Sequence, residues 1–195
     1  MPDIDLDLAD RQQILSKIKH IPAAIIENDT IKKHNTGIYC QEIPVNGFTG
    51  LASFDYKEAE YRGYFKLDFL NVNVYQQIKS NDHLLQLMNK EPDWSKLYDK
   101  EFCEKLIHVG NHYNTLIEMP EAVTSIEKMA MFLAIIRPAK RHLIGSTWAE
   151  VAQTVWQKPT DDSYYFKHSH SIGYAHLVAV HMNLLSEQES NNSSN

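Results

Sequence analysis

The sequence predicts an α+β fold, with a mixed sheet in the N-terminal half and helices in the C-terminal half. Three observations lead to this class. Short segments rich in β-branched and aromatic residues precede Val72. From Val72 onward the apolar residues recur at helical spacing. The chain has 195 residues, 43% of them hydrophobic and 23% charged, which is typical of a globular domain that buries a core.

In the N-terminal half we expect strands interrupted by one helix. The helix is predicted from Ile14, Leu15, Ile18 and Ile21, which share one face, and Pro22 limits it. Asn46-Gly47 is a turn signal between two extended segments. The expected elements are an opening strand with Asp3 and Asp5, a helix over residues 8–21, and strands over residues 37–43, 50–56 and 61–70.

The C-terminal half is expected to be helical, with Ser95 as one N-cap. The expected helices cover residues 74–89, 95–108, 120–136, 146–157 and 169–185. Residues 186–195 are polar and low in complexity, which predicts a disordered tail. The expected regions are therefore residues 1–90, which hold the candidate metal site, the helical residues 91–185, and the tail.

Three aspartates are the candidate catalytic residues. On an extended strand, side chains two positions apart share a face, so Asp3 and Asp5 point the same way while Ile4 and Leu6 enter a core on the other side. Asp68 lies among apolar neighbours of a second strand. If the two strands pair, the three carboxylates meet at one place.

Clustered carboxylates repel one another unless protons or a cation compensate them. Oxygen ligands suit Mg²⁺ or Mn²⁺, and two such ions about 4 Å apart can activate a 3′-hydroxyl and stabilise a phosphoryl leaving group. We therefore expect Asp3, Asp5 and Asp68 to bind two divalent ions. The same spacing also fits solvated acids at a strand end. Lys66 shares a strand face with Asp68, so it either pairs with that acid or contacts a substrate phosphate.

Six short segments follow one another in an order that a known family shares. They are Pro2-Asp3-Ile4-Asp5-Leu6-Asp7 with Asp10-Arg11, His34-Asn35-Thr36-Gly37-Ile38, Ser53-Phe54-Asp55, Phe65-Lys66-Leu67-Asp68-Phe69-Leu70, Ala134-Ile135-Ile136-Arg137-Pro138, and Phe166-Lys167-His168-Ser169-His170-Ser171-Ile172-Gly173-Tyr174-Ala175. In this order they resemble the C-family DNA polymerases, the bacterial replicative enzymes typified by the α subunit of DNA polymerase III. The resemblance covers most of the chain.

This resemblance implies a palm of the polymerase-β-like nucleotidyltransferase type, with attached helices. The implied reaction is transfer of a nucleotide from a deoxynucleoside triphosphate to primer–template DNA. In that reaction Asp3, Asp5 and Asp68 hold two Mg²⁺, or Mn²⁺, ions.

The resemblance also suggests residues that contact the substrates. His168, Ser169 and His170 precede or open the last expected helix, where hydroxyl and N–H groups can receive phosphate, so they are candidate substrate-binding residues together with Lys66. The basic residues after the Arg-Pro match are expected to contact DNA; they are Arg137, Lys140 and Arg141.

Several parts of the family pattern differ or are missing. The match begins at Met1, so the Gly-Ser motif that precedes it in the family has no counterpart. No Arg-Arg pair for the triphosphate occurs between Pro138 and Phe166, and His168 stands where the family has lysine. We therefore expect a reduced or split polymerase, of the kind a small viral genome encodes, that needs a second polypeptide to supply triphosphate contacts.

The net charge of −6 argues against a stand-alone nucleic-acid binder. Two alternatives remain open: a non-catalytic, polymerase-derived module that binds DNA or protein, and a metal-dependent phosphoesterase that uses the same carboxylates. Cys40 and Cys103 are isolated, and the chain has neither an apolar run of membrane-spanning length nor a basic signal segment. We expect a cytoplasmic protein, in a bacterium or in an infected host cell, without a membrane partner.

Overall fold

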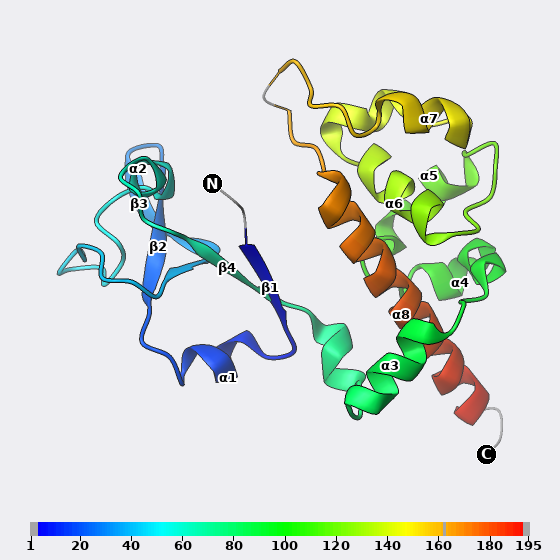
Figure 1. The fold of residues 1–195 in the computed structure, drawn as a ribbon, viewed down its shortest axis with the longest axis horizontal. Coiled ribbons are helices and arrows are strands. Elements are labelled where there is room, and N and C mark those ends of the chain that lie inside the picture. The colour runs from blue at the N-terminus through cyan, green and yellow to red at the C-terminus, as the bar shows by residue number, and fades with distance from the viewer. Residues whose placement is uncertain (1–3, 162, 193–195) are drawn as a thin grey trace. The chain divides into compact units, whose positions relative to one another are not determined.

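The computed structural model describes residues 4–161 and 163–192. The chain forms two compact units, one ending at Ile78 and the other beginning at Lys79. The first unit contains the sheet and the second is helical (Figure 1), which confirms the α+β class. The units divide twelve residues earlier than expected, because α3 (Asn81–Asn89) packs against the last helix of the second unit.

The described part of the first unit contains a four-stranded mixed sheet. Its strands are β1 (Ile4–Leu8), β2 (Ile21–Glu27), β3 (Thr30–Tyr39) and β4 (Leu67–Asn71), in the order β1-β4-β3-β2. β1 runs parallel to β4, whereas β3 is antiparallel to both of its neighbours. The strand with Asp5 therefore pairs with the strand with Asp68, which is the condition under which the acids were expected to meet.

The helix expected over residues 8–21 is much shorter in the structure. α1 covers only Arg11–Leu15, and Asp10 caps it by accepting a hydrogen bond from the Gln13 N–H at 3.1 Å. Pro22 lies in a strand instead of ending a helix. Of the apolar residues that suggested a longer helix, Ile14 and Leu15 lie in α1, Ile18 lies in the irregular segment that follows, and Ile21 begins β2.

β2 and β3 form a hairpin that the sequence analysis did not predict. Asn28 and Asp29 form its turn with φ values of 50° and 58°. A two-residue hairpin turn needs such left-handed values at both positions, and Asn and Asp adopt them more readily than most residues do. The Asn28-Asp29 pair between two apolar segments was therefore the sequence signal for this hairpin.

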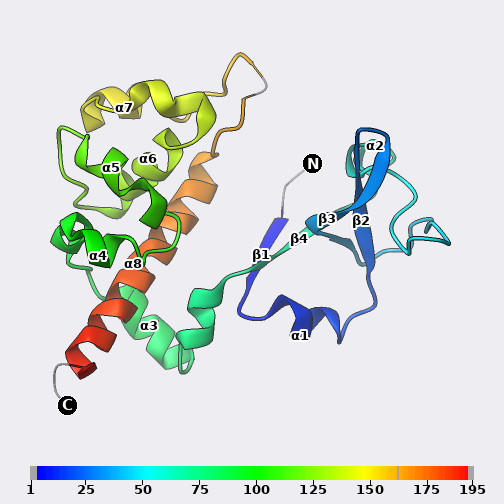
Figure 2. The same ribbon diagram turned by 180° about the vertical axis from the view of Figure 1, so that it is seen from behind.

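Two small cores lie on opposite faces of the sheet. α1 lies on one face of the sheet (Figure 2), and its Leu15 packs with Ile38 and Phe69. On the other face Tyr39 belongs to a cluster of small apolar side chains, among them Ala59 of α2 (Tyr56–Tyr61). Strand alternation puts Asp68 on the Tyr39 face of the sheet, because its neighbours Leu67 and Phe69 face α1. Two expected core residues, Ile4 and Leu6, are instead each 38% exposed.

The segment before β4 also differs from expectation. Residues 50–56 do not form a strand, and the expected hairpin is reduced to one bridge between Val45 and Ala52. Asp55 explains the change, because its carboxylate accepts hydrogen bonds from the N–H groups of Lys57 and Ile26, each at 2.9 Å. It thereby caps α2 and ties the helix to β2. Consequently β4 begins at Leu67 and not at residue 61.

The helical unit is built around the packed pair of helices α6 and α8 (Figure 1). Its helices are α3, α4 (Lys100–Cys103), α5 (Tyr113–Ile117), α6 (Ile126–Ile135), α7 (Trp148–Thr154) and α8 (His168–Asn192). Short 3₁₀ turns lie at Trp94–Tyr98, Gly110–His112 and Pro138–Leu143, and another, Asn73–Gln77, follows the sheet. Phe132, Leu133 and Val178 are fully buried members of one large core.

Two expectations in this unit are corrected. Residues 95–108 do not form one helix, because Asp93 and Asp99 cap two successive short elements and Ser95 lies inside the first. Residues 186–192, expected to be a disordered tail, continue α8. Side-chain contacts attach this end to the unit: Glu187 lies 3.0 Å from His83, and Glu189 lies 2.8 Å from the Lys96 ammonium.

Within residues 4–161 and 163–192, no helix has the length and apolar character needed to cross a bilayer. Cys40 and Cys103 are free thiols, the first exposed and the second buried. Burial raises the pKa of the Cys103 thiol to about 11, so this thiol stays protonated at neutral pH.

Candidate functional site

Asp5 and Asp68 are direct neighbours across the paired strands β1 and β4. Register partners in a parallel pair share a face, so both side chains lie on the face away from α1. Asp5 is exposed, whereas Asp68 is only 8% exposed. Asp3, the third expected ligand, lies outside the described residues.

Asp7 is a further acid on the face of β1 that carries Asp5, and it was not among the predicted site residues. Desolvation by its surroundings and the nearby Asp5 carboxylate raise the pKa of Asp7. Asp5 and Asp7 therefore act on one another, as the two-residue spacing on a strand requires. The face of β1 that carries Asp5 is acidic along its length.

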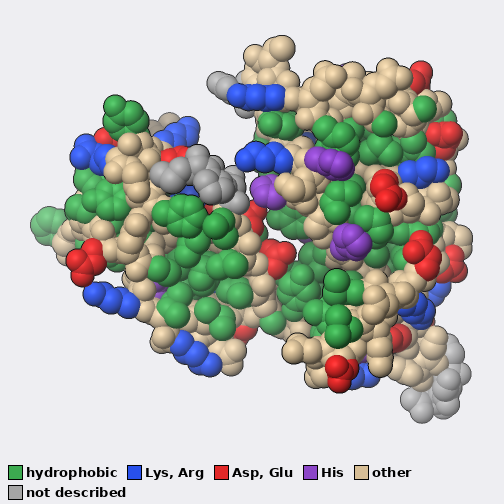
Figure 3. Space-filling model, viewed as in Figure 1, with side chains coloured by type: hydrophobic (Ala, Val, Ile, Leu, Met, Phe, Trp, Pro, Cys, Tyr) green, Lys and Arg blue, Asp and Glu red, His purple; other side chains and the backbone are tan. Residues whose placement is uncertain are grey.

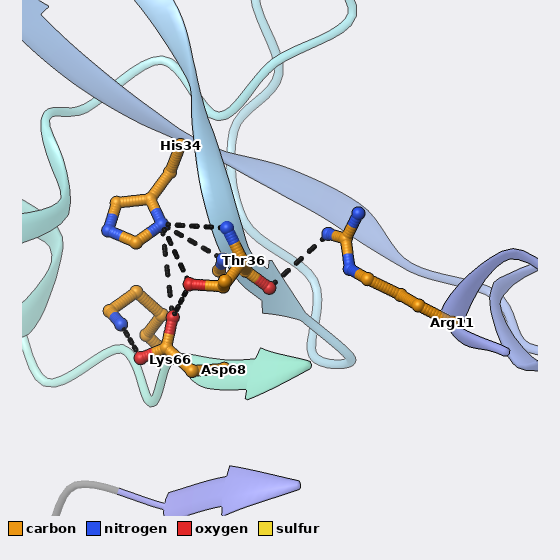
Figure 4. A network of polar contacts seen from close by, with 6 residues as sticks. Arg11, His34, Thr36, Lys66 and Asp68 are labelled. Atoms are coloured by element: carbon orange, nitrogen blue, oxygen red, sulfur yellow. Dashed lines mark hydrogen bonds and ion pairs between the residues drawn. The ribbon is translucent and has the colours of Figure 1, made fainter. Parts of the chain in front are cut away.

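The carboxylate of Asp68 has a partner at each oxygen (Figure 4). The Lys66 ammonium forms an ion pair with Oδ2. The Thr36 hydroxyl donates a hydrogen bond to Oδ1 at 2.6 Å, and Nδ1 of His34 lies 3.8 Å from the same oxygen. A charge this deeply buried needs such partners, because an unpaired one would lose its hydration without compensation.

His34 positions the strand residues around Asp68. Its Nδ1 accepts hydrogen bonds from the N–H groups of Gly37, at 2.9 Å, and Thr36, at 3.3 Å. Burial, followed by the Lys66 charge, lowers the pKa of His34. Both effects favour a neutral imidazole that acts as an acceptor, so His34 holds this bend of β3 in place rather than adding a charge.

Gly37 permits the close approach of Lys66 to Asp68. A Cβ at position 37 would lie 2.8 Å from Cδ of Lys66, 3.0 Å from Nδ1 of His34 and 3.1 Å from Cβ of Ala23. No ordinary side chain fits these distances without displacing the lysine. Thr36 and Gly37 lie in the segment that resembles the polymerase family, which was the available signal for their role.

Arg11 connects α1 to β3 and β4. Its backbone N–H donates to the Asn71 side chain at 3.1 Å, and its Nη2 donates to the Thr36 carbonyl at 3.3 Å. A cavity of about 440 Å³ adjoins it. The residues that line this cavity are mostly polar: Asp10, Arg11, Gln12, Asn35, Thr36, Phe69, Asn71 and Gln76.

The candidate divalent-ion site includes Asp68, whose carboxylate is already paired with an ammonium. In the described portion of the chain, no group of three or more His, Cys, Asp or Glu side chains is arranged to hold a metal ion. The described carboxylates at this place are Asp5 and Asp68, and Lys66 already neutralises one oxygen of Asp68. A metal ion at Asp68 would have to compete with this ammonium.

The basic residues expected at a DNA surface have different surroundings. Lys140 is only 5% exposed and donates to the Thr154 carbonyl at 2.8 Å, so its assignment as a DNA contact is wrong. Burial lowers the pKa of its ammonium. Arg137 is half-buried, with its guanidinium 4.0 Å from the Phe166 ring. Arg141 is exposed.

The three expected substrate-binding residues form the first turn of α8. His168 is exposed and stacks on Trp156, with 4.3 Å between the ring centroids. Ser169 is exposed and His170 is half-buried. They belong to the helical unit, whereas Lys66 belongs to the sheet unit.

Comparisons of the chain with protein-family models, with curated proteins and with solved structures find no match. A polymerase function therefore stays a prediction from the short motifs.

Proposed function

We propose that the sheet is a polymerase-β-like palm and that the chain is a reduced or split polymerase subunit for nucleotidyl transfer to a DNA 3′ end. The observation that carries this proposal is the register of β1 and β4, in which Asp5 lies directly beside Asp68. Two carboxylates on adjacent strands, with Asp3 two residues before Asp5, match the acids that the resemblance assigns to the metal site.

In this proposal Asp3, Asp5 and Asp68 hold divalent ions. Mg²⁺ or Mn²⁺ would supply activation of the 3′-hydroxyl and stabilisation of the pyrophosphate leaving group. Lys66 lies beside these acids, where its ammonium can meet a phosphate of the deoxynucleoside triphosphate. Thr36 and His34 keep the Asp68 carboxylate in a fixed position.

The proposed subunit depends on a second polypeptide. The exposed Arg141 remains a candidate DNA contact, but Lys140 is buried and the chain has a net charge of −6. Few phosphates can be neutralised by such a surface, so DNA binding by this chain alone should be weak and salt-sensitive. The segment between Pro138 and Phe166 also lacks the paired arginines that grip the triphosphate in the family.

One observation favours a second function, that of a non-catalytic module derived from a polymerase. Both oxygens of Asp68 are already engaged by Lys66 and Thr36. A carboxylate that is satisfied within the fold needs no ion. In that case the acids stabilise the sheet, and the chain serves to bind DNA or a polymerase polypeptide.

Primer extension with the purified chain and Mn²⁺, alone and with the products of neighbouring genes, tests the proposal. Activity that appears with a partner and is lost in Asp5→Asn and Asp68→Asn supports it. Asp82→Asn is the matched control, because Asp82 is an exposed acid of the helical unit. Folded Asp5→Asn and Asp68→Asn variants with full activity would refute the catalytic role, and hydrolysis of phosphoesters without extension would point to a phosphoesterase.

A further inference from the structure

Three buried polar atoms in the described part of the helical unit have no hydrogen-bond partner: Nε2 of His108, Nε of Arg137 and Oγ of Ser171. Buried polar groups in folded proteins are nearly always bonded, so each such exception indicates a missing partner. Two of the three belong to one connected group of side chains. We name this group the Arg137 cluster and define it as Arg137, His108, His112, Phe166 and Tyr174.

Ring contacts connect four members of the Arg137 cluster, and the charge of Arg137 acts on the fifth, His112. The Arg137 guanidinium lies 4.0 Å from the centroid of Phe166, and Phe166 stacks on Tyr174 at 5.5 Å. Tyr174 in turn meets the edge of the His108 ring at 4.6 Å. Arg137, His108 and Tyr174 are half-buried, so the cluster is desolvated but still reaches the surface. Histidine side chains are visible over the helical unit in Figure 3.

The cluster has excess positive charge. Burial lowers the pKa of Arg137, and burial together with the Arg137 charge lowers the pKa of His108 to about 4. Burial, Arg137 and Arg141 also lower the pKa of His112. Within the described residues, the charged groups that act on these three side chains are basic groups and tyrosines, with no carboxylate among them.

The backbone holds His108 in an unusual conformation. Its φ of 63° is left-handed, which costs free energy for a residue other than glycine. The turn is also tight, because Gly110 donates to the Leu106 carbonyl at 3.0 Å and a Cβ at Gly110 would lie 2.5 Å from the Glu104 carbonyl oxygen. This turn places the imidazole against the Tyr174 ring.

We propose that the Arg137 cluster binds a phosphate monoester group, with the Arg137 guanidinium as the main donor and the imidazoles of His108 and His112 as further donors. Arg137 is half-buried and has no carboxylate partner among the described residues, so an anion would stabilise it, and guanidinium groups match phosphate geometry. Free phosphate and the phosphate of a nucleotide share this chemistry. The site lies in the helical unit and does not depend on the catalysis proposed for Asp5 and Asp68.

Titration calorimetry of the full chain with orthophosphate at neutral pH and constant ionic strength tests the proposal. Arg137→Met should weaken binding by about tenfold to a hundredfold, the effect of losing one charge-assisted hydrogen bond. Lys105→Met, which removes an exposed lysine of the same unit, should leave binding unchanged. The titration contains no divalent ion, so its outcome is separate from that of the test of the proposed polymerase function.

A second variant guards against a folding defect. His108→Asn keeps a residue that adopts left-handed φ and should bind phosphate several-fold more weakly than the wild-type protein while melting normally. Without phosphate, Arg137→Met should be at least as stable as the wild-type protein, because an unpartnered buried N–H is removed. Unchanged phosphate affinity in folded Arg137→Met would overturn the proposal.

Two further ligands and one variant distinguish the remaining outcomes. Deoxyadenosine monophosphate binding more tightly than orthophosphate identifies a nucleotide as the source of the phosphate, and equal binding identifies free phosphate. A DNA oligonucleotide without terminal phosphates that competes better than either would contradict a monoester site. Asp162 lies outside the described residues. Phosphate binding by Asp162→Asn but not by the wild-type protein would show that this acid is the partner of Arg137, and would overturn the proposal.

Discussion

Replacing Lys66 by methionine should destabilise the sheet unit strongly, because it removes the cation from Oδ2 of Asp68. The side chains of Lys66 and Asp68 are only 17% and 12% exposed, so water cannot fully replace the lost ion pair. Breaking a buried pair in this way costs about 3 kcal/mol. By contrast, Lys32 and Glu27 form an ion pair at 3.0 Å with side chains 54% and 53% exposed. Lys32→Met should therefore cost about 0.5 kcal/mol or less.

Urea unfolding of Lys66→Met, Asp68→Asn and the double variant measures the coupling free energy between Lys66 and Asp68. The double variant should be more stable than Lys66→Met alone, because it no longer contains an unpaired carboxylate. Mn²⁺ should partly restore the stability of Lys66→Met if an ion can replace the ammonium at Asp68. Equal losses of stability in Lys66→Met and Lys32→Met would refute the assignment of a buried, paired Asp68.

Three further predictions concern other positions. Gly37→Ala should destabilise the sheet unit by about 1–3 kcal/mol in urea unfolding, because its Cβ would lie 2.8 Å from Lys66; no loss would show that the lysine moves freely. Lowering the pH from about 6.5 to about 4 should reduce the free energy of unfolding by about 3 kcal/mol through His108, because the unfolded chain binds a proton there at higher pH than the folded chain does. His108→Asn should flatten this part of the profile of stability against pH, and an unchanged profile would exclude His108 as its cause. Arg141→Gln should weaken DNA binding in fluorescence anisotropy, whereas the buried Lys140→Met should not; the reverse order would contradict the burial of Lys140.

The placement of the acids could be predicted because it depends on strand periodicity. Alternation along β1 and β4 places Asp5 and Asp68 on one face, and the pairing of the two strands brings them together. The partners of Asp68 could not be predicted in the same way. Thr36 reaches it only because β3 bends around His34, a contact between segments 32 residues apart in the chain.

The errors have physical causes. The apolar spacing of Ile14, Leu15 and Ile18 fits a helix, but the helix ends at Leu15. Ile18 lies in the irregular segment after it and still packs against the core that contains Leu15. Lys140 was expected on the surface because lysine usually lies there, yet one backbone acceptor, the Thr154 carbonyl, allows it to be buried. The expected tail is helical because Glu187 and Glu189 find partners on other elements.

Binding of Mn²⁺ to the wild-type chain and its aspartate variants tests the central claim most directly. Electron paramagnetic resonance measures the concentrations of free and bound Mn²⁺ in the same sample. The account predicts that the wild-type protein binds Mn²⁺, that Asp5→Asn and Asp68→Asn each lose at least one bound ion, and that Asp82→Asn binds as the wild-type protein does. Folded Asp5→Asn and Asp68→Asn variants that bind as much Mn²⁺ as the wild-type protein, or a wild-type protein that binds none, would contradict it.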